Sequence, residues 1–254
     1  MKIVVPVQLV PDLVEELVVD KSGKALDLDT VRWIISEPDD HAIEQAILMK
    51  EKDGGEVIVL APDFEGADDV LFAAAAKGAD RLVKITGDFE GGLNAHALAR
   101  ALHPLVKDMN PDLVLTGVQT HNGLDGPVGA LLAEYLQIPY IGYVSNVSVQ
   151  GNKALVSKDY PGGLKAEMEV SLPAALGISS AESAPRYVPI SKIRMVMKTS
   201  KVEDQDVGDL DPSGAAVVTR MSPPESAERA TMITGKVDDV AVKIVAIIQE
   251  QGLL

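Results

Sequence analysis

The fold of this chain is decided by one stretch, VLTGVQTHNGLDGPVGALLAE, which runs from Val114 to Glu134. An apolar run ends at Thr116, a glycine-rich loop follows, and an apolar helical pattern begins near Pro127. Proline is tolerated in the first turn of a helix, where backbone N–H groups are free to face a ligand. The stretch therefore predicts a buried strand, a loop whose backbone approaches a ligand closely, and a helix whose first turn suits a phosphate. An ordinary tight turn is the alternative interpretation.

Short β-branched runs alternate with helical patterns through the first 140 residues. This alternation is typical of βαβ units and a parallel sheet. Strands are expected at residues 2–8, 56–61, 81–85, 112–116 and 174–178, and helices at 39–52, 68–77, 93–107 and 127–137. The strands are almost purely apolar, as strands covered on both faces should be. The fold class is therefore α/β, with a doubly wound, mostly parallel sheet.

Two β-hairpins are expected to decorate this core, at residues 17–28 and 153–170, because both contain residues that favour tight turns. Beyond residue 183 the periodicity fades, and only residues 237–249 look helical again. A forty-residue irregular stretch, residues 184–226, is unusual inside a compact domain. We therefore expect an α/β nucleotide-binding domain at 1–183 and, at 184–254, an extended C-terminal arm that lies against another subunit.

The composition excludes several classes of protein. The chain of 254 residues has no cysteine, which excludes disulfides, thiolate metal sites, iron–sulfur clusters and cysteine nucleophiles and fits a cytoplasmic location. No stretch approaches the roughly 20 apolar residues of a transmembrane helix. The net charge of −15 argues against nucleic-acid binding. Basic residues nevertheless gather between Arg186 and Lys201, as either a solvated surface or a contact region for a protein partner.

Motifs of common catalytic classes are absent from the sequence. It has no G-x-x-x-x-G-K-[ST] loop, no G-x-G-x-x-G after the first strand, no G-x-S-x-G elbow and no H-E-x-x-H. His96 and His103 lie too far apart on one helix to hold a metal ion together, and His41 and His121 are better explained by hydrogen bonding than by proton transfer. We therefore expect no catalytic residue and no metal site.

A second segment, SEPDDHAIEQAILMKE from Ser36 to Glu51, joins a strand-like run to a helix near the same edge of the sheet. Together with the first stretch it resembles the β subunit of the electron transfer flavoproteins, over essentially the whole chain. The matching residues are Ala42, Ile43, Glu44, Ala46, Lys50 and Glu51 in one segment, Gly117, Gln119, Gly129, Ala133, Glu134 and Pro139 in the other, and Gly78 to Arg81.

The resemblance implies an adenine nucleotide alpha hydrolase-like fold and an electron carrier without catalytic side chains of its own. It also implies a heterodimer with an α subunit that binds FAD. The arm after Ala184 would wrap around this α subunit. Flavin-dependent dehydrogenases would dock at a recognition loop with Pro185, Arg186, Tyr187 and the anchor Ile190. The implied nucleotide contacts are Pro6, Ser36, Glu37, Pro38, Asp39, Pro62, Asn122, Gly123, Leu124, Asp125, Gly126, Pro127, Val128, Gly129, Ala130, Leu131, Leu132 and Ala133.

Because of two departures from the family pattern, the identity of the bound nucleotide is not decided by the resemblance. Ser36 and Glu37 replace an Asn-Pro pair, and residues 122–126 replace an acidic cluster. Most family members hold AMP here and electron-bifurcating members hold a second FAD, which Gly123 slightly favours. The alternatives from other classes are a stand-alone nucleotide sensor resembling universal stress proteins and, less favoured, an adenylating enzyme.

Overall fold

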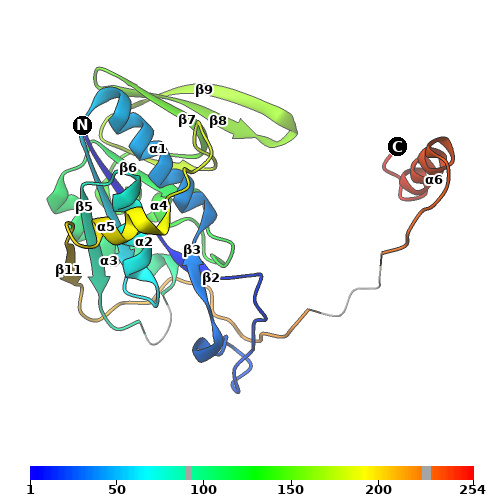
Figure 1. Ribbon diagram of the computed structural model, residues 1–254, viewed down its shortest axis with the longest axis horizontal. Coiled ribbons are helices and arrows are strands. Elements are labelled where there is room, and N and C mark those ends of the chain that lie inside the picture. The colour runs from blue at the N-terminus through cyan, green and yellow to red at the C-terminus, as the bar shows by residue number, and fades with distance from the viewer. Residues whose placement is uncertain (90–92, 225–229) are drawn as a thin grey trace. The chain divides into compact units, whose positions relative to one another are not determined.

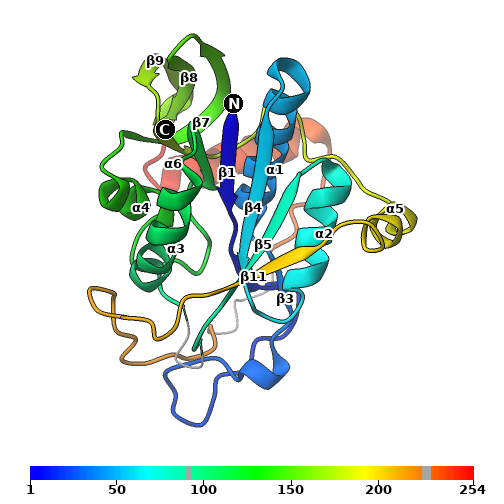
Figure 2. The same cartoon turned by 90° about the vertical axis from the view of Figure 1, so that its left-hand side faces the viewer.

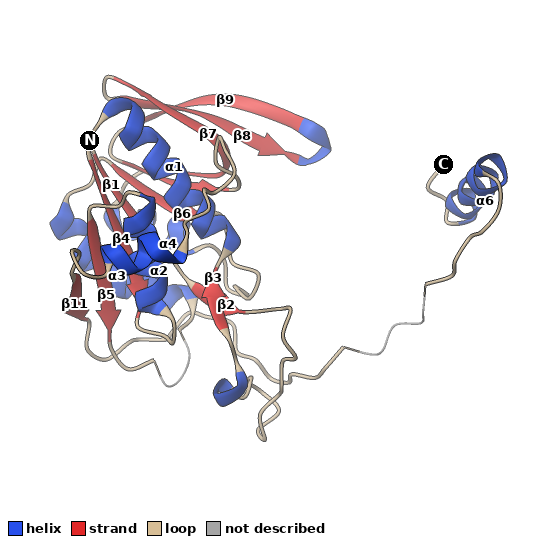
Figure 3. Ribbon diagram, viewed as in Figure 1, coloured by secondary structure: helices blue, strands red, loops and turns tan. Residues whose placement is uncertain are grey.

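The computed structural model describes residues 1–89, 93–224 and 230–254, which form two compact units, Met1–Arg220 and Met221–Leu254. The larger unit is built on a nine-stranded sheet with the order β11-β5-β4-β1-β6-β10-β7-β8-β9 (Figures 1 and 3). From β11 to β7 all neighbours are parallel, whereas β7, β8 and β9 form antiparallel pairs. The strands are β1 (Lys2–Pro6), β4 (Glu56–Pro62), β5 (Arg81–Thr86), β6 (Leu113–Gly117), β7 (Tyr140–Gln150), β8 (Lys153–Tyr160), β9 (Leu164–Ser171), β10 (Ala174–Ile178) and β11 (Val202–Asp206).

Helices cover both faces of the parallel part of the sheet. Figure 2 shows α1 (Glu37–Asp53) and α2 (Ala67–Lys77) on one face and α3 (Ala95–Met109) and α4 (Val128–Leu136) on the other. Alternate residues of a strand point to opposite faces, so Ile3 and Val5 of β1 join the core under α1 and α2, whereas Val4 joins the core under α3 and α4. This confirms the predicted doubly wound α/β fold.

The hairpin predicted at residues 17–28 forms only in part, because its strands do not extend over the predicted range. Its turn exists, since the Gly23 N–H donates to Asp20 O at 3.1 Å, but only the single bridge Val19–Leu26 forms beyond it. Ladder pairing is made instead by β2 (Leu9–Pro11) and β3 (Trp33–Ile35), which are antiparallel and lead into the core. The segment between them contains the 3₁₀ helix η1 (Leu28–Thr30) and is largely exposed, so burial does not favour longer strands there. The second hairpin, β8 and β9 joined by the 3₁₀ turn η2 (Pro161–Gly163), is as predicted.

Part of the expected arm packs on the chain's own sheet. β11 adds to the edge of β5 in parallel, and Arg81 on β5 forms an ion pair with Glu203 on β11 at 2.8 Å. The helix α5 (Ile190–Val196) packs on α2. Residues 225 and 226, at the end of the predicted irregular stretch, lie outside the described residues.

The second unit contains α6 (Val237–Glu250), as the helical pattern predicts. Large apolar side chains of this helix, among them Val242, Ile244, Val245 and Ile247, are exposed. Of the helices in the described ranges, none is long and apolar enough to cross a membrane.

Candidate functional site

The sheet changes its direction of winding between β1 and β6. From β1 the chain crosses to β4 and then β5 on one side, whereas β6 pairs with the other side of β1. Open α/β sheets bind ligands at such a switch point, beyond the carboxyl ends of the strands. Pro6 ends β1, Pro62 ends β4, α1 begins just after Ser36, and residues 118–127 connect β6 to α4. The segments that carry the predicted nucleotide contacts therefore all start at the same edge of the sheet, the one formed by the carboxyl ends of its parallel strands.

Asp39, in the first turn of α1, is buried at this switch point with 2% of its surface exposed. Its Oδ1 accepts a hydrogen bond from the Gly117 N–H at 2.6 Å, and its Oδ2 accepts one from the Gln8 N–H at 3.0 Å. Burial raises the pKa of this carboxyl to about 7, and the hydrogen bonds from Gly117, Gln8 and Ser36 oppose the rise. Asp39 can therefore change its protonation near neutral pH.

The first turn of α4 is tightly packed and uncapped. Pro127 is at the N-cap position and makes no side-chain hydrogen bond to the helix, so the first N–H groups lack the usual capping partner. A Cβ on Gly129 would strike the hydroxyl of Thr116. That hydroxyl is buried and has no hydrogen-bond partner among the described residues. An unpaired buried hydroxyl beside an uncapped helix start marks a place where a ligand or water oxygen could bind.

The loop that leads into this turn lines a hollow of about 510 Å³, within the size range of small-molecule sites. Its wall includes the predicted residues Asn122, Gly123, Leu124, Asp125 and Gly126, all from the loop after β6. Several hydrogen bonds hold the loop, among them one from Gln119 Nε2 to Gly123 O at 2.8 Å and one that Asp125 Oδ2 accepts from the Ala95 N–H at 3.0 Å. Further lining residues that the sequence did not reveal are Gln8, Lys24, Leu93, Asn94, Ala95, Thr120, Pro212 and residues 215–218.

The other predicted contacts do not line this hollow. Ser36, Asp39, Pro6 and Pro62 are buried at the edge of the sheet, whereas Glu37 is exposed. Pro38 lies against Gly117, where a Cβ would come within 2.8 Å of the Pro38 carbonyl carbon. Along α4, Ala130 and Leu131 are half-buried, and Val128, Leu132 and Ala133 pack their side chains into the core under α3 and α4. Those last three offer a ligand only their backbone.

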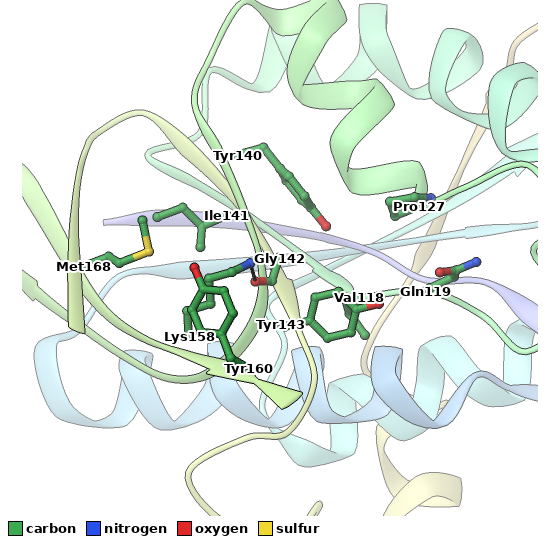
Figure 4. Close-up of a pocket in the computed structure, with 10 residues that line it drawn as sticks. All are labelled: Val118, Gln119, Pro127, Tyr140, Ile141, Gly142, Tyr143, Lys158, Tyr160 and Met168. Atoms are coloured by element: carbon green, nitrogen blue, oxygen red, sulfur yellow. Dashed lines mark hydrogen bonds between the residues drawn. The ribbon is translucent and has the colours of Figure 1, made fainter. Parts of the chain in front are cut away.

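A second hollow, of about 400 Å³, lies on the other side of the loop against β7 and β8 (Figure 4). Lys158 Nζ donates to Gly142 O at 2.8 Å and lies over the rings of Tyr143 and Tyr160, 5.6 and 5.3 Å from their centroids. Tyr143 has a left-handed backbone with φ of 61°. The Tyr140 hydroxyl is buried and lacks a hydrogen-bond partner in the described part of the chain, and burial raises its pKa to about 12.

The predicted partner-binding residues divide into an anchor and an exposed set. Arg186 is held on α1, where its Nε donates to Glu44 Oε1 at 2.8 Å and its guanidinium pairs with Glu51 at 2.5 Å. Tyr187 and Ile190 are 86% and 64% exposed. Pro185 and Arg186 line a hollow between α1, α2 and this segment. In the described ranges no group of histidine and carboxylate side chains could hold a metal ion.

The comparisons with known proteins all indicate the same family. The model of the electron transfer flavoprotein domain matches residues 25–210. The chain is 33% identical to the electron transfer flavoprotein subunit beta of Methylophilus methylotrophus, with 98% of each chain covered. It is 30% identical to the protein of the same name from Clostridium acetobutylicum, with 99% of each covered. It is also 29% identical, over the full length of both, to the caffeyl-CoA reductase-Etf complex subunit CarD of Acetobacterium woodii.

Proposed function

This chain belongs to the electron transfer flavoprotein family, among the β subunits, and we propose that it binds an adenine nucleotide in the hollow beside residues 122–126. The nucleotide is AMP or a second FAD. In this proposal the chain pairs with an FAD-binding α subunit and passes electrons between flavin-dependent dehydrogenases and an acceptor. The cytoplasmic location remains an expectation from the cysteine-free sequence.

One set of observations supports the nucleotide proposal: the uncapped first turn of α4 lies beside the Thr116 hydroxyl, which has no partner among the described residues, and the loop that leads into this turn lines a hollow of suitable size. Backbone N–H groups and a hydroxyl are donors that suit a phosphate. Lys24 brings a positive charge to the wall of the hollow, and Asn94 and Thr120 bring neutral polar groups that suit a ribose or a base. These residues fit an adenine nucleotide without any nucleophile or metal ligand.

The bound flavin supplies the electron chemistry of such a carrier. This chain's residues hold and orient the nucleotide and shape its electrostatic surroundings. The loop hydrogen bonds of Gln119 and Asp125 keep residues 122–126 in place before a ligand arrives, which lowers the entropy cost of binding. Asp125 and Asp39 add negative charge near the hollow, so the phosphate is expected at α4 rather than beside either carboxylate.

The exposed apolar side of α6 supports the α-subunit proposal. A helix with several exposed large aliphatic residues in water indicates a surface that a partner covers. Co-expression of the chain with its α partner should give a yellow complex, and deletion of residues 221–254 should weaken the assembly while leaving the sheet intact. A shortened chain that still pairs at full strength would contradict this role for the second unit.

Flavin counting separates the two nucleotides. After denaturation of the purified heterodimer, one flavin with one AMP indicates AMP in this chain, and two flavins indicate a second FAD. A permanently monomeric, colourless chain that holds its nucleotide alone would favour the sensor function instead.

A further inference from the structure

A single buried side chain joins the two strands on either side of the switch point. Gln8 follows β1 and Gly117 ends β6, and both donate their backbone N–H groups to the carboxyl of Asp39. Asp39 comes from α1, which leads away to β4. Three segments that are far apart in the sequence therefore meet at one carboxyl group.

This meeting point is closely packed. A Cβ on Gly117 would lie 2.7 Å from both the backbone nitrogen and Oδ1 of Asp39. Side-chain atoms do not come so close, so only glycine fits at the end of β6. The start of α1 lies directly against that strand end, and the α1 N-terminus adds a favourable field for a negative charge.

The bridge also determines where an anionic ligand can bind. Free backbone N–H groups at strand ends and helix starts are the usual donors to a ligand phosphate. Here the Gln8 and Gly117 N–H groups are already taken by an internal anion. A phosphate in the same crevice would find these donors occupied and would face a buried carboxylate of the same charge. The uncapped first turn of α4, on the far side of the loop, keeps its donors free.

We propose that Asp39 is a positioning residue of the nucleotide site, an internal anion that fixes the backbone of Gln8 and Gly117 and directs the nucleotide phosphate to α4. Asp39 does not line the hollow, so in this proposal it acts through the backbone that it holds. Gln8 lines the hollow and Gly117 begins its loop, so a change at Asp39 reaches the ligand through both. The inference rests on the proposed nucleotide binding.

The test compares Asp39→Asn with Asp40→Asn in the complex with the α subunit, after the nucleotide of this chain has been removed. Asp40 is the next residue of the same helix turn, but its carboxylate pairs with Lys77 and does not line the hollow. Asparagine has one acceptor oxygen in place of two, so Asp39→Asn breaks one of the two hydrogen bonds from the Gln8 and Gly117 N–H groups. Calorimetric titration with AMP, and separately with FAD, should show affinity lowered at least about tenfold, or about 1.4 kcal/mol. Asp40→Asn should change affinity by less than about twofold.

A pH profile separates positioning from a general loss of structure. Only the ionised carboxyl accepts both N–H groups, so wild-type affinity for FAD should rise with pH through the titration of Asp39. FAD is the better probe because a phosphate monoester such as AMP titrates near pH 6 itself. The charged group that acts on Asp39 is Asp40, which is itself paired with Lys77 on α2, and Glu37 in the same turn is exposed. From the ends of β1 and β6, backbone N–H groups of Gln8 and Gly117 face the carboxyl. Asp39→Asn should abolish the rise, and Asp40→Asn should keep it.

Equal affinity and an equal pH slope in wild type and Asp39→Asn would overturn the positioning role while leaving the proposed function in place. If Asp39→Asn does not assemble, the wild-type profile decides, and a flat FAD affinity between about pH 6 and about pH 8.5 overturns the inference. A wild-type complex in which this chain binds neither AMP nor FAD overturns the proposed function, and the positioning role with it.

Discussion

Arg186 is fixed to α1 by Glu44: its Nε donates to Glu44 Oε1 at 2.8 Å, and its backbone N–H donates to Glu44 Oε2 at 3.0 Å. Glu44 is 2% exposed, so this carboxylate depends on Arg186 for its charge partner. Glu51, about two turns further along the same face of α1, pairs with the other side of the guanidinium. The segment after Arg186 therefore leaves the domain from a fixed point, and the exposed Tyr187 and Ile190 follow it directly.

The two glutamates should differ in their effect on stability. Glu44→Gln weakens a buried charge-assisted pair, and we expect it to lower the free energy of unfolding by about 1.5–3 kcal/mol. Glu51→Gln changes an exposed pair and should cost at most about 1 kcal/mol. Thermal melting of the two variants in the same buffer measures the difference. Equal melting temperatures would show that Arg186 is not anchored through Glu44.

Tyr187 and Ile190 should serve docking rather than folding. Ile190→Asp places a charge on a side chain that is already exposed, so the melting temperature should change little. Reduction of the complex by a dehydrogenase that reduces the wild type should show a KM raised about tenfold or more, with kcat nearly unchanged. Leu164→Asp, at an equally exposed position on β9, is the matched control and should leave KM unchanged. Equal effects of the two substitutions would remove the special role of the segment.

Thr116 should affect stability and binding in opposite directions. Thr116→Val replaces a buried hydroxyl that has no hydrogen-bond partner in the described ranges with a methyl group of similar size. Without nucleotide the variant should be as stable as wild type or slightly more stable. Nucleotide affinity should fall about tenfold if the hydroxyl binds the ligand. Calorimetry and melting curves on the same sample test both parts, and unchanged affinity would exclude Thr116 from the site.

The carboxyl of Asp39 should make the stability of the nucleotide-free protein depend on pH. Its pKa in the folded chain is about 7, above the value of 3.8 expected when unfolded, so the folded state binds the proton more tightly. This contribution to stability is complete below about pH 4 and is lost as pH rises to about 7. The melting temperature of wild type minus that of Asp39→Asn should therefore fall across this range and level off above it. A difference that is independent of pH would mean that Asp39 titrates normally.

The repeating parts of the fold could be predicted because each follows from a local pattern. The apolar runs at β4 and β6 and the glycine after α2 carry their own signals, because strands buried on both faces of a parallel sheet are apolar throughout. β11 gave no such signal. Three of its five residues are acidic, and it pairs through its backbone and the Arg81–Glu203 ion pair.

The lining of the hollow follows from the sequence only in part. Residues 122–126 belong to the loop that the sequence indicates by its glycines and by the helix start after a buried strand. Lys24 and residues 215–218 could not be predicted, because they reach the hollow from irregular segments whose path depends on tertiary contacts. The hydrogen bonds of Asp39 to Gln8 and Gly117 were also hidden, since an acidic residue at a helix start is usually explained by the helix dipole alone.

The most direct test of the central claim is mass spectrometry of the small molecules released by denaturing the purified heterodimer, combined with the flavin count per complex. We expect an adenine nucleotide in addition to the α-subunit flavin: one equivalent of AMP, or a second equivalent of FAD. A complex that transfers electrons at full rate and releases one flavin and no other nucleotide would contradict the claim that this chain is a nucleotide-binding subunit.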